Sequence, residues 1–574
     1  SSIPDNQLTG IEQIDLTGNS TLTLSVLEVL NVSGTSNTLI VTGDSMATVN
    51  RGSGWILTGF ETIGSEVFKV FQQNAATLKV GDFIATETFS FRTLPLSPLG
   101  SQGFVINGTA ANDYSGRSVS SAGDVNGDGF DDLIIGAFRD DPDGNISAGE
   151  SYVVFGKSGG FTAAIDLATL NGTTGFRLDG VDAGDEAGAS VSSAGDVNGD
   201  GFSDLIIGAR SADSSGNNYT GASYVVFGKS GGFASAIDLS SLDGNSGFRL
   251  EGIDNGDNTG RSVSGAGDVN GDGFDDLIIG AYNADPNGNS SAGESYVVFG
   301  KSGGFVSVID LSTLDGTTGF RLDGIDGNDF SGFSVSTAGD VNGDGYDDLI
   351  IGAFGAFSGE NSSAGESYVV FGKSGGFAAA IDLATLDGNT GFRLDGIDED
   401  DKSGSSVSSA GDVNGDGFDD LIIGAYAADP GGSNRAGESY VVFGKSGGFA
   451  ATIDLNSLDG VTGFRLDGVD GNDLSGFSVS SAGDVNGDGF DDLIIGAPYA
   501  IANGISRSGT SYVVFGKSGG FAAQIDLATL GGNSGFRLDG IDNVDNTGRS
   551  VSGAGDVNGD GFDDLIIGAF LADP

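Results

Sequence analysis

The sequence has no cysteine and no histidine among its 574 residues, and it has only eight prolines, one methionine and one tryptophan. The missing cysteines exclude disulfides and thiolate metal sites. The missing histidines exclude imidazole ligands, Ser-His triads and histidine general bases. A bound metal can provide the stabilisation that disulfides give elsewhere. Any metal in this protein must be bound by oxygen atoms.

Positive charge is also scarce, because 24 lysines and arginines stand against 80 aspartates and glutamates, for a net charge of −56. Such a surface repels nucleic acids and anionic membranes, so we expect no nucleic-acid partner. No segment approaches the ~18 consecutive apolar residues of a membrane-spanning helix, and we expect no membrane insertion. The charge favours cations and neutral partners.

One nine-residue segment, 124–132 with the sequence DVNGDGFDD, sets the organisation of the chain. It recurs almost unchanged, each copy starting 72 residues after the previous one, at Asp196, Asp268, Asp340, Asp412, Asp484 and Asp556. Glycine is abundant, with 104 residues, but it does not follow the triplet period of collagen. Seven copies at one spacing indicate a tandem array.

Within each copy, oxygen-bearing residues stand at alternate positions. Asp124, Asn126 and Asp128 occupy positions 1, 3 and 5. Phe130 at position 7 can supply its backbone carbonyl, Asp132 occupies position 9, and the glycine at position 6 permits a sharp bend. Carboxylates, an amide and a carbonyl around one point suit Ca²⁺, which takes about six to eight oxygens, better than Mg²⁺, which keeps its waters.

The same positions of all seven copies are the predicted calcium ligands, so we expect up to seven bound Ca²⁺ ions. The second copy has Ser203 at position 8, where the others have aspartate, and position 8 is not expected to be a ligand. The predicted ligands are Asp124, Asn126, Asp128, Phe130 and Asp132; Asp196, Asn198, Asp200, Phe202 and Asp204; Asp268, Asn270, Asp272, Phe274 and Asp276; Asp340, Asn342, Asp344, Tyr346 and Asp348; Asp412, Asn414, Asp416, Phe418 and Asp420; Asp484, Asn486, Asp488, Phe490 and Asp492; and Asp556, Asn558, Asp560, Phe562 and Asp564.

Two other interpretations of the loop fit less well. An EF-hand shares positions 1, 3, 5 and 6, but it needs glutamate at position 12 and a helix on each side. Position 12 is Ile135, within an apolar segment typical of a strand. A solvated Asp-Gly turn is the usual interpretation of a single such sequence, but seven copies with identical oxygen spacing argue against it.

Each 72-residue unit contains four segments typical of strands. They are Ser-Val-Ser before the loop, Asp-Leu-Ile-Ile-Gly-Ala after it, Ser-Tyr-Val-Val-Phe, and Gly-Phe-Arg-Leu-Asp. Leu-Ile-Ile and Val-Val-Phe are continuous apolar runs, as in strands covered on both faces. A segment such as Ile-Asp-Leu-Ala-Thr-Leu predicts one helical turn. Four-stranded sheets repeated radially form a β-propeller, for which seven blades is a common number.

The loop, followed by an apolar strand and Gly-Ala, resembles the FG-GAP repeat of integrin α-subunit β-propellers and their bacterial relatives. The resemblance covers residues 103–574 and implies an all-β fold, a seven-bladed propeller with calcium at positions 1, 3, 5, 7 and 9 of each loop. Integrins bind calcium in only some of their blades, whereas all seven loops here carry the predicted ligands. The resemblance further implies a calcium-binding extracellular protein, secreted or at the cell surface, that acts in adhesion, with calcium in a structural role.

Outside the repeats, residues 1–90 show short alternating segments between Gly, Asn and Ser breaks, which predicts a small all-β domain. They resemble segments of large repetitive bacterial surface proteins and exoproteins. Residues 91–102, with Pro95 and Pro98, predict a linker. The chain starts without a signal sequence and stops in mid-repeat, so we expect a fragment of a longer protein.

The last blade is expected to be incomplete, because six Tyr-Val-Val-Phe segments accompany seven loops. Residues 103–108 should supply its outer strand, and its third strand would follow residue 574. Alternatively, the array continues and seven is a lower bound.

In an up-and-down blade, alternate connections lie on opposite faces. The calcium loops and the Gly-Lys-Ser-Gly-Gly loops should share one face, and the most variable loops, such as 138–144 and 210–216, should share the other. Loops that carry function on a rigid scaffold tend to vary, although drift of exposed loops would give the same pattern. We predict a protein or glycan ligand on the variable face.

No catalytic motif accompanies this scaffold, and we predict no catalytic residue and no enzyme activity. The segment 155–159, Phe-Gly-Lys-Ser-Gly, lacks the first glycine of a phosphate-binding loop, and Lys157 and its equivalents are expected to pair with nearby aspartates. Two alternatives to adhesion stay open. One is a structural or filament-forming surface-layer component that self-associates through the incomplete blade, and the other is a carbohydrate-binding module of a larger secreted enzyme.

Overall fold

The structure is a computed structural model that describes residues 102–213 and 218–572, together with 93–96, Leu99 and the backbone of eight strands within residues 1–92. The chain divides into two compact units. The first comprises mainly Ser1–Arg92, and the second comprises most of residues 93–574.

The eight strands of the first unit pair into two small sheets. One has the order β1-β3-β7-β6-β5 and the other the order β2-β4-β8. Strand structure thus occurs where the alternation predicts it, while an independent small domain stays a prediction. The strands are β1 (Gln13–Leu16), β2 (Thr21–Thr23), β3 (Thr38–Gly43), β4 (Thr48–Asn50), β5 (Ile56–Ile63), β6 (Glu66–Gln73), β7 (Ala76–Gly81) and β8 (Ala85–Glu87).

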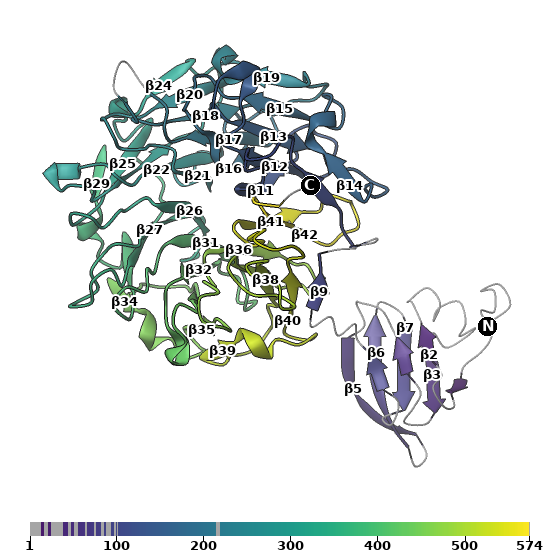
Figure 1. The fold of residues 1–574 in the computed structure, drawn as a ribbon. Helices are drawn as coiled ribbons and strands as arrows, with labels where there is room; N and C mark the ends of the chain where they lie inside the picture. The colour runs from purple at the N-terminus through teal and green to yellow at the C-terminus, as the bar shows by residue number, and fades with distance from the viewer. Residues whose placement is uncertain are drawn as a thin grey trace. The chain divides into compact units, whose positions relative to one another are not determined.

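The second unit is an all-β propeller in which six complete blades surround a central axis (Figure 1). Each blade starts at the axis with the Ser-Val-Ser segment and continues outward through three antiparallel neighbours. The inner strands are β11 (Ser118–Gly123), β16 (Ala187–Gly195), β21 (Ser262–Gly267), β26 (Ser334–Gly339), β31 (Ser406–Gly411) and β36 (Ser478–Gly483).

The second, third and fourth strands of the blades come from the three remaining segments predicted as strands. The second strands are β12 (Asp132–Ala137), β17 (Asp204–Ala209), β22 (Asp276–Ala281), β27 (Asp348–Ala353), β32 (Asp420–Ala425) and β37 (Asp492–Ala497). The third strands are β13 (Glu150–Val154), β18 (Ala222–Val226), β23 (Glu294–Val298), β28 (Glu366–Val370), β33 (Glu438–Val442) and β38 (Thr510–Val514). The fourth strands are β15 (Gly175–Asp179), β20 (Gly247–Glu251), β25 (Gly319–Asp323), β30 (Gly391–Asp395), β35 (Gly463–Asp467) and β40 (Gly535–Asp539).

A short fifth strand, parallel to the fourth, covers the outer edge of each blade, so the prediction of four-stranded blades needs correction. Three residues are too few to show alternation, but the outer edge has unpaired backbone groups that such a strand can satisfy. In blades one to five it comes from the following repeat, as β19 (Ala236–Asp238), β24 (Val308–Asp310), β29 (Ala380–Asp382), β34 (Thr452–Asp454) and β39 (Gln524–Asp526). In the sixth blade it is β9 (Thr93–Pro95), which lies within the predicted linker.

The predicted helical turn follows each of the five edge strands β19 to β39, and β14 (Ala164–Asp166) as well, as a three-residue 3₁₀ helix. The Asp166 side chain caps the first of these turns by accepting a hydrogen bond from the Ala168 backbone N–H at 3.0 Å. The turns are η3 (Leu167–Thr169), η4 (Leu239–Ser241), η6 (Leu311–Thr313), η7 (Leu383–Thr385), η9 (Leu455–Ser457) and η10 (Leu527–Thr529), and three further 3₁₀ turns are η2 (Pro142–Gly144), η5 (Pro286–Gly288) and η8 (Pro430–Gly432).

The hydrophobic cores lie between neighbouring blades. Ile422 of β32 packs toward the sixth blade, while Leu421 and Ile423 belong to the core shared with the fourth blade. Successive residues of a strand point to opposite faces, so both faces of β32 are covered. The continuous apolar runs therefore have the environment that the sequence predicts.

Beyond the sixth blade, β41 (Val551–Gly555) and β42 (Asp564–Ile567) form a two-stranded antiparallel sheet. β41 lies beside β36 on one side and β11 on the other. One hydrogen bond, from a valine N–H to a serine Oγ, recurs between neighbouring inner strands. It joins β41 to β36 (Val551 to Ser478, 3.1 Å) and β11 to β41 (Val119 to Ser550, 3.1 Å). The inner strands thus form a closed ring.

The segment 103–108 contributes β10 (Val105–Asn107), which pairs in parallel with β14. The fourth strand of a complete blade pairs with its edge strand in the same way. Among the described residues, six blades are complete, and no strand connects β42 to β10.

Candidate metal centres

The seven aspartate loops connect inner strands to second strands and therefore lie at the same end of every blade. In the third loop, the Asp268 carboxylate accepts hydrogen bonds from the backbone N–H groups of Gly271 at 2.7 Å and Asp272 at 3.0 Å. Its second oxygen accepts from Gly273 at 2.8 Å. Asp272 accepts from the Phe274 N–H at 3.2 Å. These bonds curl the loop around its first residue.

The ninth residue of the loop, Asp276, is fully buried. One carboxylate oxygen accepts from the Gly300 N–H at 2.9 Å and the other from the Val269 N–H at 3.1 Å. Burial raises the pKa of Asp276 to about 8, and the charges of Asp272 and Asp268 add to the rise. Because Gly300 follows the third strand, the bond also shows that the Gly-Lys-Ser loop shares this face, as predicted.

The same environment recurs around the ring. Burial raises the pKa of the ninth residue to about 8 in five loops, at Asp132, Asp204, Asp276, Asp348 and Asp420, and to about 6 at Asp564. A buried carboxylate with two like charges nearby is unfavourable in its ionised form. A divalent cation bound beside the carboxylate would instead favour its ionised form.

The donor set of the loop fits a hard cation. Asp268, Asn270, Asp272, the Phe274 carbonyl and Asp276 would hold it, and the Asn270 amide already lies 3.4 Å from both Asp276 oxygens. Within the described residues, no three acidic side chains converge on one point, because Asp268 and Asp272 hydrogen-bond the loop backbone instead. The bound ion and its ligands stay predictions. Bound calcium would supply positive charge among these carboxylates.

Position 8, which is not a predicted calcium ligand, joins neighbouring loops. The Asp275 carboxylate accepts a hydrogen bond at 2.7 Å from the Asp196 backbone N–H in the preceding loop. The bond recurs between the other loops and closes the ring through Asp131 and Asp556 at 3.0 Å. Within the described part of the chain, the Ser203 side chain makes no such bond in the second blade. Comparing Ser203 with its six aspartate equivalents is the signal that could have revealed this role.

The position-8 bond should contribute to stability. Asp275→Ala is expected to lower the free energy of unfolding by about 1–2 kcal/mol, because it leaves a backbone donor without its charged acceptor. Ser203→Asp should raise it by about 1 kcal/mol by supplying the missing bond. Urea denaturation measures both, with Asp275→Asn, which keeps one acceptor oxygen, as the control. Equal stability of Asp275→Ala and the unmodified protein would contradict a role for the bond.

The aromatic residue at position 7 also links loops, in addition to offering its carbonyl. Gly271 has a φ of 73°, and a Cβ there would lie 2.2 Å from the ring of Tyr346 in the next loop. The same contact joins Gly559 to Phe130 across the point where the ring closes. The glycine at position 4 is therefore required by this close approach as well as by its backbone angle.

The lysines of the Gly-Lys-Ser loops do not pair with aspartates, so that prediction is wrong within the described residues. Lys157 Nζ lies 4.8 Å from the centre of the Phe161 ring, and each equivalent lysine lies over the phenylalanine four residues later. The turn places that ring beneath the lysine, and a cation over an aromatic face is favourable.

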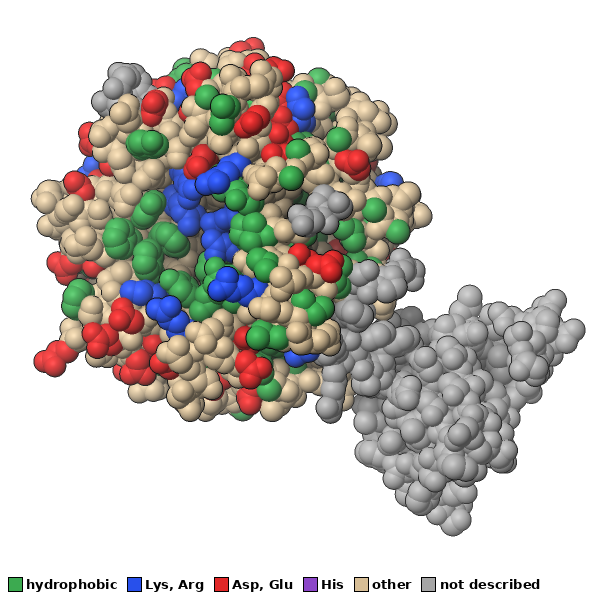
Figure 2. Space-filling model, in the orientation of Figure 1, with side chains coloured by type: hydrophobic (Ala, Val, Ile, Leu, Met, Phe, Trp, Pro, Cys, Tyr) green, Lys and Arg blue, Asp and Glu red, His purple; other side chains and the backbone are tan. Residues whose placement is uncertain are grey.

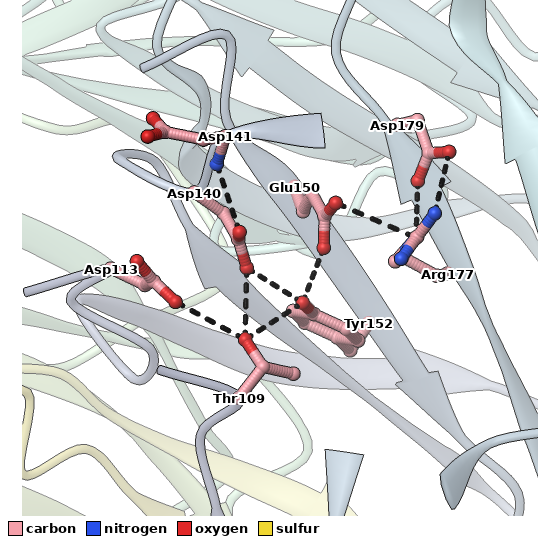
Figure 3. Close-up of polar contacts among 8 residues, drawn as sticks. All are labelled: Thr109, Asp113, Asp140, Asp141, Glu150, Tyr152, Arg177 and Asp179. Carbon is pink, nitrogen blue, oxygen red and sulfur yellow. Dashed lines mark hydrogen bonds and ion pairs between the residues drawn. The ribbon is translucent and has the colours of Figure 1, made fainter. Parts of the chain in front are cut away.

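The opposite end of each blade carries the variable loops, and in the first blade a polar network underlies them (Figure 3). In the first blade, the Tyr152 hydroxyl donates to Glu150 and lies 2.7 Å from Asp140. Arg177 pairs with Asp179 at 2.5 Å and with Glu150 at 3.5 Å. Burial raises the pKa of Glu150 to about 8. The glutamate, tyrosine, arginine and aspartate recur in blades three, four and five. The network holds the bases of these loops.

The predicted variable loops lie on this face. Residues 138–144 end in the 3₁₀ turn η2, and 282–292 and 426–436 contain the equivalent turns η5 and η8. Of the predicted loop 210–216, residues 214–216 lie outside the described residues. The helices among the described residues are three-residue turns, so none of them could span a lipid bilayer.

Seven segments of the chain match the FG-GAP repeat family, at residues 115–154, 187–226, 259–298, 331–370, 403–442, 475–514 and 547–570. Together with the fold and the loops, this match shows that the chain contains an integrin-like FG-GAP β-propeller. A bacterial type of this propeller stays a prediction.

Similar proteins include two integrins and a phospholipase. Integrin alpha pat-2 of Caenorhabditis elegans is 29% identical over 246 residues, which is 40% of this chain and 17% of that protein. Integrin alpha-V of Gallus gallus is 30% identical over 243 residues, 42% of this chain and 20% of that protein. Phosphatidylinositol-glycan-specific phospholipase D of Dictyostelium discoideum is 28% identical over 342 residues, 57% of this chain and 33% of that protein. The chain thus spans a third or less of the length of these relatives.

Proposed function

We propose that this protein is an extracellular, calcium-stabilised adhesion propeller that binds a protein ligand through its variable face. The observation that carries the proposal is the division of the ring into two faces. One face repeats the same acidic loop seven times, and the other presents loops of different sequence on buried polar networks. A constant scaffold with variable loops is the usual arrangement of a binding module. The integrin relatives support a ligand-binding role.

We also propose that the ring is a seven-bladed propeller. The closed set of inner strands and the pairing of β10 with β14 support this, because both repeat the contacts of complete blades. A Tyr-Val-Val-Phe strand between β42 and β10 would complete the last blade.

Exchange of the variable loops tests the adhesion proposal. The loops 282–292, 354–364 and 426–436 have equal length, so the sequence of the first can replace the other two without changing the spacing. Beads coated with the full chain would be tested for attachment to a panel of immobilised matrix proteins and glycans in millimolar calcium. We expect the exchange to reduce attachment at least about tenfold, while Val461→Thr on the calcium-loop face leaves it unchanged. Attachment that survives the exchange would contradict the proposal.

A second candidate function has one observation in its favour. The alignment with the phospholipase covers 57% of this chain, which is more than the alignment with either integrin covers. A propeller of this kind could therefore be a carbohydrate-binding module of a larger secreted enzyme. In that case the beads would attach to glycans only, and no protein of the panel would retain them.

A further inference from the structure

Positive charge gathers at one place on this acidic protein, near the centre of the face shown in Figure 2. Arg117, Arg261 and Arg549 stand at the same position of three repeats, just before the inner strands β11, β21 and β41. This end of the inner strands is opposite the calcium loops and carries the variable loops. Arg210 begins the variable loop of the second blade. The closed ring brings these four arginines within range of one another's charge.

Among the described residues, three of these arginines form no ion pair with a carboxylate. They are Arg117, Arg261 and Arg549. The Arg261 guanidinium lies 4.5 Å from the centre of the Phe333 ring, and that of Arg549 lies 3.9 Å from the centre of the Phe477 ring. The Nε of Arg549 is buried and has no hydrogen-bond partner among the described residues. A buried donor without a partner is costly.

The positive charges within this arginine cluster also repel one another. Burial lowers the pKa of Arg117 and of Arg261 to about 9, and the neighbouring arginine charges add to the shift. Burial and the charge of Arg261 lower the pKa of Arg549 to about 10. All three stay charged at neutral pH. Glu186 offsets part of this charge, but it is already paired with Arg210 at 2.8 Å. An acceptor supplied from outside would relieve the repulsion.

Aromatic rings border the arginines. Phe333 and Phe354 meet edge to face with their ring centres 4.5 Å apart, and Phe330 stacks on Phe354 at 5.3 Å. Tyr282 contacts Phe333 at 5.6 Å. The centre therefore offers guanidinium donors beside apolar surface. A single carboxylate flanked by apolar residues matches it better than a polyanion, which the remaining charge of the protein would repel.

We propose that this arginine–aromatic centre binds an aspartate or glutamate side chain on an exposed loop of a protein ligand. The inference rests on the proposed function and names the chemistry that the variable face recognises. Guanidinium groups bind carboxylates through paired, charge-assisted hydrogen bonds. Aromatic rings and arginines are also the residues that most often dominate protein interfaces. A bound carboxylate would give Arg549 Nε an acceptor and offset the positive charge.

Two peptides test the inference. Ac-Gly-Phe-Asp-Phe-Gly-NH₂ and the same peptide with asparagine would be titrated into the full chain in millimolar calcium by calorimetry. We expect the aspartate peptide to bind at least about tenfold more tightly. The triple variant Arg117→Gln, Arg261→Gln and Arg549→Gln should lose this preference. The matched triple control Lys229→Gln, Lys301→Gln and Lys373→Gln, which removes three exposed cations from the calcium-loop face, should keep it.

Further measurements separate the possible outcomes. Arg261→Gln should raise the melting temperature of the free protein because it removes like-charge repulsion. A lower melting temperature, together with an unchanged preference for the aspartate peptide, would show that Arg261 has a structural role and would overturn the inference. Competition by sodium sulfate without any preference for the aspartate peptide would show a general anion site and would also overturn it. If loop exchange abolishes bead attachment while the peptides bind equally, this inference fails and the proposed function stands.

Discussion

Removal of calcium with excess EGTA should lower the melting temperature of this protein more than any single substitution in its loops. Calcium bound to the native loops, but not to the unfolded chain, stabilises the fold by mass action. At a free calcium concentration of ten to a hundred times the dissociation constant, the stabilisation is about 1.4–2.7 kcal/mol for each site. Asparagine at position 3 reduces the charge of each site, so we expect dissociation constants of roughly 0.1–1 mM. In about 10 mM calcium, which is ten to a hundred times such a dissociation constant, up to seven sites should raise the melting temperature by on the order of 10 °C or more.

Two controls accompany the calcium experiment, a different divalent cation and a variant of one loop. Magnesium at the same concentration should give a much smaller shift, because it keeps its waters and prefers fewer protein ligands. Asp268→Asn should remove the contribution of one loop and leave most of the calcium effect. A melting curve that is identical in EGTA and in calcium would show that the loops are ordinary turns. It would also remove the main support for a calcium-stabilised adhesion protein.

Gly352→Ala should destabilise the propeller by about 3 kcal/mol or more, the upper range for overpacking a close interface. Gly352 lies in β27, where it faces the backbone of the next blade. A Cβ at Gly352 would lie 1.9 Å from the carbonyl oxygen of Gly404. That oxygen belongs to the backbone and cannot move aside as a side chain could. The free energy of unfolding from urea denaturation measures the effect.

Gly376→Ala is the matched control for this substitution. Gly376 is exposed and does not have a left-handed φ, and a Cβ at this position would have no described atom within 4 Å. Its replacement should change the free energy of unfolding by less than about 0.5 kcal/mol. If both variants had the same stability, blades four and five could separate enough to admit a methyl group, and the close inter-blade approach would not be a constraint on the fold.

Features that repeat within a single unit could be predicted from the sequence. The four main strands follow from local composition, because an apolar run such as 421–423 must be covered on both faces wherever it lies. The regular spacing of Asp268, Asn270, Asp272 and Asp276 likewise identifies the loop, since the chain itself holds these residues near one another. The lysine contacts were not predictable from the sequence. Opposite charge suggests that Lys157 pairs with an aspartate, but the folded turn places the Phe161 ring beneath it.

The features that sequence alone did not reveal join different repeats. Asp275 and Asp196 are 79 residues apart, and Val119 and Ser550 are 431 apart. The repeat, the strands and the oxygen donors of the loops could be predicted because they depend on neighbours along the chain. The fifth strand and the position-8 bond depend on how adjacent blades pack, and the arginine centre depends on closure of the ring. Folding of this kind places side chains with no local relationship at hydrogen-bonding or Coulombic distance.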